Sequence, residues 1–340
     1  MINLETAQLF FEEFLGKKAS DFEILPQSGS ARMNFIGTSN EDKFVITYNE
    51  NLLENEAFFY FSEIFSKLNL NTPKIFKINK ERNLYVQEFL GEETLSEIIA
   101  REGESERVKN LVKQTLEKLF QLQKTTQNKI DFSKTFEYEK YDDLPIIHDL
   151  YYFKNFLIDV LELQYHKSSL LKEFKQIAHK IESLQPQRLM IRDFQSRNIL
   201  VKENEVFFID YQAAMKGPAM YDVVSFLYQA KANFSENFKT QMLDFYFSFY
   251  KNEEKKALTG ALKYCKLIRF TQVLGAYGFR GLIQRKPHFI ASLDQGIENL
   301  VELTKQEKEI NLYPELKNLI LKLNSEESKY KIQKIVNDKH

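Results

Sequence analysis

The first 90 residues alternate between short apolar runs typical of strands and longer runs with helical spacing. Residues 4–15 place apolar side chains three and four positions apart, and Gly16 follows as a helix stop. A second stretch with helical spacing covers residues 53–68. Turn-forming residues bound five short runs that predict strands at 22–25, 33–36, 43–48, 74–78 and 84–89. The pattern therefore predicts a β-rich segment of about five strands around one helix, ending near Gly91.

After Gly91 the pattern becomes mostly helical. Thr94 and Glu97 fit a capping box, which opens a helix at Leu95. One β-rich island at 188–210 interrupts the helical pattern. Helices are predicted at 106–124, 148–165, 168–184, 219–232, 236–251, 255–278, 288–308 and 313–336. The result is an α+β chain with a small β-rich lobe at 1–90 and a larger helical lobe at 91–340.

Charge and cysteine content exclude several classes of function. The chain has 47 Lys and Arg against 48 Asp and Glu, a formal net charge of −1, which disfavours non-specific binding to nucleic acid or anionic membranes. The single cysteine, Cys265, excludes a disulfide framework, and its apolar surroundings favour a core position. The N-terminus lacks the features of a signal peptide, and no apolar stretch approaches the roughly 20 residues of a membrane span. We therefore expect a cytoplasmic protein.

Residues 188–227 carry the candidate chemistry. A strand runs into a loop that holds Asp193 and Asn198, and a following hairpin ends at Asp210. Magnesium prefers oxygen ligands, so an amide and a carboxylate from adjacent loops can hold it against phosphates. Asp193 can then accept the proton of an incoming hydroxyl group, as in protein kinases. Each residue alone could belong to an ordinary turn, and the prediction of phosphoryl transfer depends on their combination.

The motifs in this segment resemble a known family. The run R-D-F-Q-S-R-N, followed by F-I-D-Y-Q, G-P and Y-D, resembles the aminoglycoside phosphotransferase and choline kinase superfamily. The details FQSRN, IDYQ and GPAMYD are most similar to the bacterial anomeric sugar kinases that act on N-acetylmuramate and N-acetylglucosamine in cell-wall recycling. The resemblance implies a protein-kinase-like fold, with a nucleotide-binding small lobe, ATP as co-substrate and Mg²⁺.

The same resemblance implies roles for individual residues. Asp193 would be the catalytic base, Asn198 a metal ligand and Asp210 the principal metal ligand. Asp222, in the Y-D pair, would be structural and brace the catalytic loop. Arg197 could reach the transferring phosphate or the sugar.

The small lobe departs from the kinase pattern. Kinases place a lysine on the third strand to grip phosphates, and here that position falls near Thr47 or Tyr48. The candidate phosphate loop at 26–35 contains one glycine, Gly29, beside Ser28. Arg32 could supply the missing positive charge, but the segment is also compatible with an ordinary hairpin turn that carries a surface arginine.

Two further positions in the small lobe are candidates. Glu56 stands where kinases keep a glutamate paired to the strand lysine; its partner could be Arg32, although a solvated helix acid is the favoured interpretation. Residues 85–91 correspond to the hinge of the resembling fold, so backbone groups of Glu88 to Leu90 would bind the purine edge of the nucleotide.

The acceptor is predicted to bind the helical lobe. Residues 279–288 are locally basic and include Arg280, Arg285, Lys286 and His288. This cluster suits an acceptor with a carboxylate or many hydroxyl groups, and the resemblance favours a sugar contact for Arg280, with Lys286 beside it. A solvated helix end explains the same cluster, because cations favour helix C-termini.

The sequence therefore predicts a kinase that transfers the γ-phosphate of ATP, or of another nucleoside triphosphate, to a hydroxyl group of a small molecule. The favoured acceptor is an amino sugar phosphorylated at its anomeric hydroxyl. One alternative is a nucleotide-binding regulator without turnover, motivated by the missing lysine and the glycine-poor loop. Another is an aminoglycoside or amino-alcohol phosphotransferase, against which the basic 279–288 cluster argues. We expect a sugar or amino-alcohol partner, no nucleic-acid or membrane partner, and a monomer or weak dimer.

Overall fold

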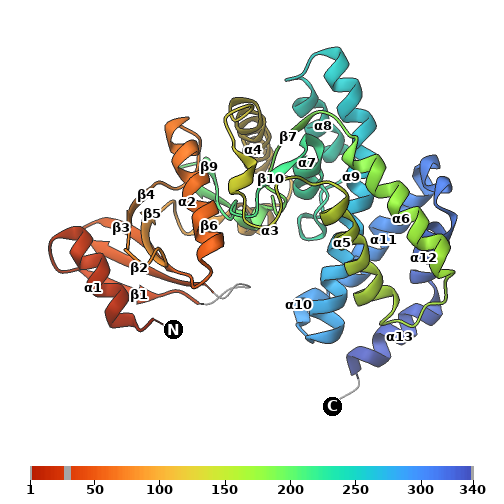
Figure 1. Ribbon diagram of the computed structural model, residues 1–340, viewed down its shortest axis with the longest axis horizontal. Helices are drawn as coiled ribbons and strands as arrows, with labels where there is room; N and C mark the ends of the chain where they lie inside the picture. The colour runs from red at the N-terminus through yellow and green to blue at the C-terminus, as the bar shows by residue number, and fades with distance from the viewer. Residues whose placement is uncertain (1, 27–31, 338–340) are drawn as a thin grey trace. The chain divides into compact units, whose positions relative to one another are not determined.

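The structure is a computed structural model that describes residues 2–26 and 32–337 of the 340-residue chain. Contacts divide the chain into two compact units (Figure 1). Unit 1 comprises Met1–Glu139 and Ile191–Met215, and unit 2 comprises Lys140–Met190 and Lys216–His340. The segment with Asp193, Asn198 and Asp210 thus belongs to the same unit as the β-rich N-terminal region. The division into lobes at residue 90 stays a prediction.

Unit 1 contains the five predicted strands in one antiparallel sheet of order β1-β2-β3-β5-β4. The strands are β1 (Asp21–Ile24), β2 (Met33–Ser39), β3 (Asp42–Tyr48), β4 (Ile75–Ile78) and β5 (Leu84–Glu88). Helix α1 (Leu4–Leu15) packs its buried Ala7 and Phe11 against this sheet. Gly37 is required there, because a Cβ atom at that position would lie 2.4 Å from the Phe11 ring.

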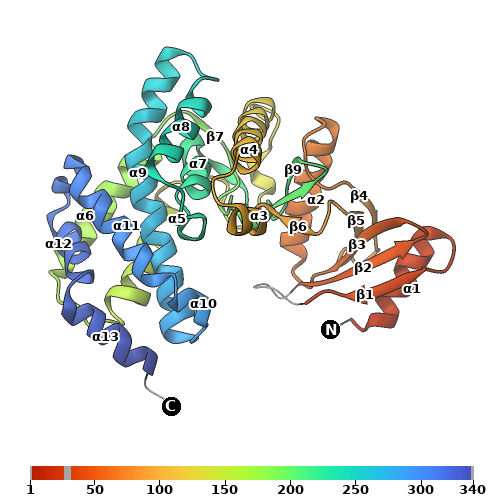
Figure 2. The ribbon, with the colours of Figure 1, turned by 180° about the vertical axis from the view of Figure 1, so that it is seen from behind.

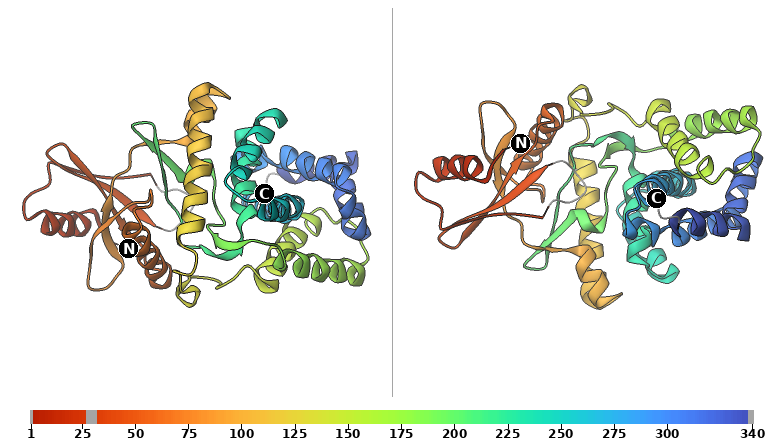
Figure 3. Two further views of the ribbon diagram at one scale, coloured as in Figure 1. Left: turned by 90° about the horizontal axis from the view of Figure 1, so that it is seen from above. Right: turned by 90° about the horizontal axis from the view of Figure 1, so that it is seen from below.

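Helix α2 (Leu52–Lys67) begins at the N-cap Asn51 and buries Phe58, Phe61 and Phe65. Helix α3 (Leu95–Glu102) starts at the predicted capping box, in which Thr94 and Glu97 bond each other's backbone. Helix α4 (Glu106–Thr125) and the short 3₁₀ helix η1 (Phe132–Lys134) follow. Helix α4 lies beside strand β9 (Glu205–Phe208) of the predicted hairpin (Figure 3). These elements complete unit 1.

The hairpin belongs to a second, three-stranded sheet of order β6-β8-β9. Strand β8 (Ile199–Lys202) pairs with β9 on one side and with β6 (Glu93–Thr94) on the other. The hairpin was predicted from sequence, but β6 was not, because a two-residue strand shows no alternation of apolar and polar residues.

Unit 2 is mainly helical and surrounds the long helix α9 (Asn252–Tyr277). Helix α5 (Asp143–Phe153) approaches α9 closely, since a Cβ atom on Gly275 would lie 2.7 Å from the Phe153 nitrogen. Helices α9 and α11 (Leu293–Gln306) also lie side by side (Figure 2). The other long helices are α6 (Lys167–Glu182), α7 (Ala219–Leu227), α8 (Glu236–Phe247), α12 (Pro314–Leu323) and α13 (Glu326–Asn337).

Several predicted helix limits in unit 2 were wrong. The helix predicted at 148–165 begins earlier, at the cap Asp142, and ends in the π-helical turn η2 (Lys154–Ile158). The helix predicted at 288–308 is divided into α10 (Pro287–Ile290) and α11, with a break near Ser292. The helix predicted at 313–336 is divided at Ser325, which caps α13 by accepting from the Ser328 backbone. Apolar spacing continues across such breaks, so periodicity alone does not reveal them.

A small two-stranded sheet pairs β7 (Gln187–Met190) with β10 (Met215–Pro218), a strand that sequence analysis missed. Cys265 is fully buried on α9, as predicted for a core position. Among the helices that the structure describes, none is long and apolar enough to cross a bilayer.

Candidate active site

The β8–β9 hairpin brings Asn198 and Asp210 together. Its turn residues Glu203 and Asn204 both have positive φ angles, 53° and 61°, which match the right-handed twist of two paired strands. Just outside the strands, the Ile209 N–H donates to the Asn198 carbonyl at 3.0 Å. The residues at the two ends of the hairpin are therefore adjacent, as the sequence predicted.

The loop with Asp193 is tied to this hairpin at several points. Arg192 has a φ angle of 72°, which is uncommon for a residue with a side chain, and its guanidinium donates to Glu137 at 2.8 Å. Phe194 is buried and packs edge-on against Phe208, with 4.8 Å between ring centroids. Asn198 Nδ2 donates to the Asp193 carbonyl at 2.9 Å. Asp193 itself is half-buried, and its backbone carbonyl is the atom that Asn198 contacts.

Three donors surround the Asp210 carboxylate. Asn198 Nδ2 donates to Oδ2 at 3.1 Å, and Gln212 Nε2 donates to Oδ1 at 2.9 Å. Arg32 Nη1 lies 3.3 Å from the same Oδ1 atom. The carboxylate remains 37% exposed, and a φ angle of 63° at Asp210 turns the chain sharply at the strand end. Asp210 is thus oriented from three sides while it stays accessible.

The oxygen atoms of this cluster fit Mg²⁺. Asn198 uses its amide nitrogen for Asp193 and Asp210, so its Oδ1 atom is the one that can act as a metal ligand. A carboxylate and an amide oxygen are hard ligands of the kind magnesium takes, together with phosphate oxygens and water. Across residues 2–26 and 32–337, no group of three or more His, Cys, Asp or Glu forms a metal cage. The site therefore suits a magnesium ion that arrives with a phosphorylated ligand.

Arg32 forms an ion pair with Asp210. Its side chain is only 17% exposed and also pairs with Glu54, at the start of α2. Burial lowers the pKa of Arg32, but the neighbouring Tyr85, Asp210 and Glu54 raise it above its usual value. Asn49 Nδ2 in turn donates to Glu54 at 2.8 Å. The alternative of a surface arginine is therefore wrong.

The favoured interpretation of Glu56 as a solvated helix acid agrees with the structure, and the strand position without a lysine is neutral. Glu56 does not pair with Arg32; it is 48% exposed and pairs with Arg82, whose Nη2 lies 2.7 Å from Oε2. Thr47, one of the two positions near which the resemblance places the kinase lysine, is buried in a neutral cluster. Its Oγ1 donates to Asn34 at 2.8 Å and accepts from Gln87 at 3.0 Å. The positive charge near Asp210 thus comes from Arg32, before β2, and not from β3.

Sequence analysis missed two residues of this site. Glu54 lies two positions before the candidate Glu56. Gln212 stands two positions after Asp210, is 7% exposed and holds the Asp210 carboxylate. A signal for Gln212 was present, because it is the last residue of the I-D-Y-Q motif.

Tyr211 connects the site to α2. Its hydroxyl lies 2.7 Å from Ser62 Oγ, and its ring packs against Phe58 and Phe65, each at 5.1 Å between centroids. Burial raises the pKa of this hydroxyl far above its ordinary value, so it stays protonated. The residue that follows Asp210 is therefore anchored in the aromatic core under α2.

Arg197, predicted to reach the transferring phosphate or the sugar, and the other residues predicted for the nucleotide are only partly placed. Arg197 is exposed on the short 3₁₀ helix η3 (Ser196–Asn198). Glu88 ends β5 and Leu90 is buried just after it, so both lie in the predicted hinge segment. Ser28 and Gly29 lie outside the described residues. The roles of these residues stay predictions.

The residues predicted to bind the acceptor, and the residue predicted to brace the catalytic loop, lie in unit 2. Arg280 belongs to the π-helical turn η5 (Gly278–Ile283), with its guanidinium 5.3 Å from the Phe289 ring centroid. The Lys286 N–H donates to the Arg280 carbonyl at 2.9 Å, which brings the two residues together. Asp222 is fully buried on α7. Sugar contacts for Arg280 and Lys286, and bracing by Asp222, stay predictions.

Solved structures with similar folds include several phosphotransferases. An aminoglycoside phosphotransferase, APH(2'')-IIa, in complex with gentamicin is 17% identical with a TM-score of 0.60, covering 88% of this chain and 97% of that chain. Spectinomycin phosphotransferase APH(9)-Ia in complex with ADP and spectinomycin is 13% identical with a TM-score of 0.59, covering 88% and 94%. Plasmodium vivax ethanolamine kinase is 15% identical with a TM-score of 0.54, covering 86% and 85%. The fold is therefore kinase-like, as predicted.

Sequence comparison identifies the family directly. None of the curated proteins is significantly similar to this chain. The model of the phosphotransferase enzyme family (APH) matches residues 21–258, which include the small sheet, the β8–β9 hairpin and the cluster around Asp210. Because this match covers more than half of the sequence, the chain belongs to the phosphotransferase enzyme family.

Proposed function

We propose that this phosphotransferase transfers the γ-phosphate of ATP to an amino sugar, at the anomeric hydroxyl group. The observation that carries the proposal is the cluster at the β8–β9 hairpin. There, Asn198 bonds both the Asp193 backbone and the Asp210 carboxylate, at 2.9 and 3.1 Å. ATP as phosphate donor is supported by similar structures that contain ATP or ADP.

Each residue of the cluster has a separate task in this proposal. Asp193 orients the acceptor hydroxyl and takes its proton, while the hydroxyl oxygen bonds to the γ-phosphorus and the bond to the bridging oxygen of ADP breaks. Asn198 Oδ1 and the Asp210 carboxylate would hold Mg²⁺, which supplies charge neutralisation when bound. Arg32, paired with Glu54, takes the place of the absent strand lysine beside the phosphates.

The amino-sugar acceptor is supported by the motifs and by the basic residues of unit 2. A site for polycationic aminoglycosides needs a surplus of carboxylates, whereas the predicted acceptor segment carries Arg280 and Lys286. Guanidinium and ammonium groups suit hydroxyl and carboxylate groups of a sugar such as N-acetylmuramate.

A second candidate is an aminoglycoside or amino-alcohol phosphotransferase. It is favoured by the similar structures, which include a gentamicin complex and an ethanolamine kinase. At 15–17% identity, those structures support the fold and leave the acceptor open. A regulator without turnover is disfavoured, because Arg32 supplies the positive charge that the third strand lacks.

One acceptor panel separates these candidates. Magnesium-dependent ATP consumption is measured with N-acetylmuramate, N-acetylglucosamine, kanamycin, ethanolamine and choline. Consumption with an N-acetylated sugar, and loss of the reducing end in the product, supports the proposal. Consumption only with kanamycin or an amino alcohol overturns it in favour of the second candidate. ATP binding without consumption in any mixture favours the regulator.

A further inference from the structure

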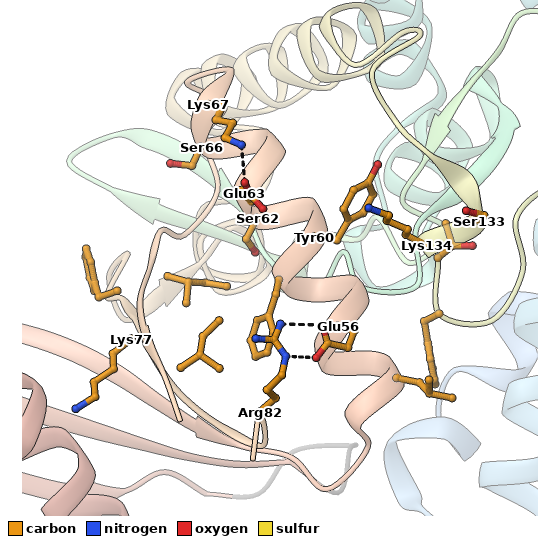
Figure 4. A pocket seen from close by; sticks show the side chains of 17 residues that line it. Glu56, Tyr60, Ser62, Glu63, Ser66, Lys67, Lys77, Arg82, Ser133 and Lys134 are labelled. Atoms are coloured by element: carbon orange, nitrogen blue, oxygen red, sulfur yellow. Dashed lines mark hydrogen bonds and ion pairs between the residues drawn. The ribbon is translucent and has the colours of Figure 1, made fainter. Parts of the chain in front are cut away.

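A cavity of about 950 Å³ lies beside α2, within unit 1. Its lining comes from α2, from β4 and the turn that follows it, and from residues 133–136 (Figure 4). Helix α2 contributes residues three and four positions apart, which form one stripe along the helix: Glu56, Phe59, Tyr60, Glu63, Ser66 and Lys67. The volume lies in the range of small-molecule sites. No residue of the proposed ATP site lines it.

The cavity offers apolar surface for the body of a ligand. Phe59 is buried, Ile75 and Ile78 are half-buried, and Phe76 remains 44% exposed. An exposed phenylalanine next to buried apolar side chains is the composition expected of a ligand site.

The charges around the cavity favour an anion. Four cations line it, Lys67, Lys77, Arg82 and Lys134, against the two acids Glu56 and Glu63. Both acids are neutralised within the lining, by Arg82 and Lys67. Lys77 points away from the other charged groups in Figure 4 and pairs with Glu13 at 2.8 Å.

Lys134 is the lining cation that forms no ion pair among the described residues, although the carboxylates of Asp131 and Glu63 are near enough to interact with its charge. It is exposed, and its ammonium lies 5.1 Å from the centroid of the Tyr60 ring. The loop that carries Lys134 is fixed on α2, because the Asp131 N–H donates to the Tyr60 hydroxyl at 2.6 Å. Figure 4 shows Lys134 and Tyr60 together on one side of α2. A cation on an aromatic face, beside an apolar cavity, is suited to an acid group carried by an apolar body.

We propose that this cavity binds a small amphipathic organic anion, with an aromatic or aliphatic body and one acid group, and that its occupancy is linked to nucleotide binding. The acid group pairs with Lys134, and the body packs against the apolar part of the cavity lining. The proposed link between anion binding and nucleotide binding depends on the proposed ATP site, whereas the anion site itself does not.

Helix α2 is the element that both sites share. Ser62 lines the cavity and bonds the hydroxyl of Tyr211, the neighbour of Asp210, at 2.7 Å. Glu54, on the first turn of the same helix, holds Arg32 beside Asp210. A ligand that displaces α2 therefore shifts the residues that contact Asp210 and its neighbour Tyr211. Thermodynamic linkage then requires that the nucleotide change the affinity for the anion by the same factor by which the anion changes the affinity for the nucleotide.

The probe for the test is 8-anilinonaphthalene-1-sulfonate, an aromatic body with one acid group. We expect saturable fluorescence binding to the full chain with one site. Lys134→Glu should weaken the affinity at least tenfold, whereas the matched control Lys129→Glu, which changes an exposed lysine outside the lining, should not. Ser66→Phe, which fills the cavity from an exposed position on α2, should also abolish binding. Near-UV circular dichroism verifies that each variant is folded.

Failure of the probe to saturate, or equal affinity in Lys134→Glu and Lys129→Glu, would overturn the anion site. The linkage is tested by titrating Mg·ATP calorimetrically, with and without saturating probe, and a severalfold change in affinity is expected. Identical ATP affinities would overturn the linkage. These results are independent of the acceptor panel, because neither readout requires turnover.

Discussion

Asp210 receives side-chain donors from three parts of unit 1: Arg32 before β2, Asn198 before β8 and Gln212 after β9. Neutral amides orient the carboxylate on both of its oxygens, and the guanidinium of Arg32 balances its charge. In the proposed function the Asp210 carboxylate would hold Mg²⁺, whose charge would balance that of Asp210. Arg32, still paired with Glu54, could then contact the phosphates. The two amides keep Asp210 in place during this exchange.

Substituting the proposed base should separate binding from turnover. Asp193→Asn keeps the size of the side chain but removes its ability to accept a proton. We expect kcat to fall by about 10³-fold, within the range attributed to general base catalysis, while ATP affinity changes less than twofold. Steady-state kinetics and calorimetric ATP titration measure the two quantities. A near wild-type kcat would exclude Asp193 as the base.

Arg32 should be required for nucleotide affinity. Arg32→Met leaves Glu54 and Asp210 without their shared cation, and we expect the Kd for Mg·ATP to rise at least tenfold. Arg32→Lys should recover only part of this loss, because one ammonium does not bridge two carboxylates as a guanidinium fork does.

The matched control is Lys43→Met. Lys43 lies on β3 of the five-stranded sheet, pairs with Glu92 at 2.6 Å and is 43% exposed. Removing its charge should therefore leave the Kd for Mg·ATP unchanged. Equal ATP affinities for Arg32→Met and Lys43→Met would contradict the role of Arg32.

The residues that form the candidate site could be predicted from sequence more fully than the ion pairs between them. Asp193, Asn198 and Asp210 flank strands and a short hairpin, and a hairpin of fixed register brings its ends together. The partner of Arg32 could not be chosen in the same way. Glu54 and Glu56 are two positions apart on α2, so they point about 200° apart around the helix axis. Sequence does not fix the rotation of α2 against the sheet, and only that rotation selects Glu54.

At the scale of elements, helix α2 contributes residues both to the surroundings of the candidate site and to the cavity. Its Phe58, Phe65 and Ser62 contact Tyr211, and Ser62 also lines the cavity described above. Its N-terminus is fixed by Asn51, which accepts from the Glu54 backbone N–H at 3.3 Å. A helix with contacts at both sites transmits displacement from one site to the other more readily than a mobile loop does.

The hydrogen bond between α2 and Tyr211 should contribute measurably to stability. Ser62 Oγ donates to the Phe58 carbonyl at 2.7 Å, so the Tyr211 hydroxyl is the donor to Ser62. Tyr211→Phe keeps the aromatic packing and leaves Ser62 with one partner, and we expect a loss of about 1 kcal/mol. Thermal unfolding measures the loss. The control Tyr330→Phe, at a 67% exposed position on α13, should be neutral, and equal effects would contradict the argument.

The helices α1 and α2 were predicted within one residue at each end, whereas the breaks inside the helices predicted at 288–308 and 313–336 and the strands β6 and β10 were missed. Helices α1 and α2 repeat apolar residues over three turns or more, so the predicted limits 4–15 and 53–68 are close to the observed ones. Strands β6 and β10 contain only two and four residues, and β10 includes a glycine and a proline. Such strands are specified by the partners they pair with, and those partners are distant in sequence.

At the scale of the whole molecule, the proposed tasks are divided between the two units. The residues proposed for ATP and metal belong to unit 1, and those proposed for the acceptor belong to unit 2. Arg280→Ala should therefore raise the KM for the sugar about tenfold and leave the Kd for Mg·ATP unchanged. Initial rates and calorimetry measure these values. A change in ATP affinity, or an unchanged sugar KM, would contradict the division.

Buried tyrosines in both units should make the protein sensitive to alkaline pH. Burial raises the pKa of Tyr85, in unit 1, and of Tyr250, in unit 2, to about 12 each. It also raises the pKa of Tyr211 and Tyr246 above their ordinary values. Above pH 10 the unfolded chain releases these protons while the folded chain retains them, so the unfolded state binds fewer protons and stability falls as pH rises.

The stabilisation is fully present below pH 10 and is lost as the pH rises toward the folded-state pKa near 12. Each such tyrosine contributes a slope of about 1.4 kcal/mol per pH unit, so the unfolding temperature should drop steeply between pH 10 and 11.5. Thermal unfolding at a series of pH values, with tyrosinate absorbance recorded in parallel, measures both effects. If all tyrosines ionised near pH 10 in the folded protein, with no loss of stability, these hydroxyl groups would be accessible to water and not part of the core.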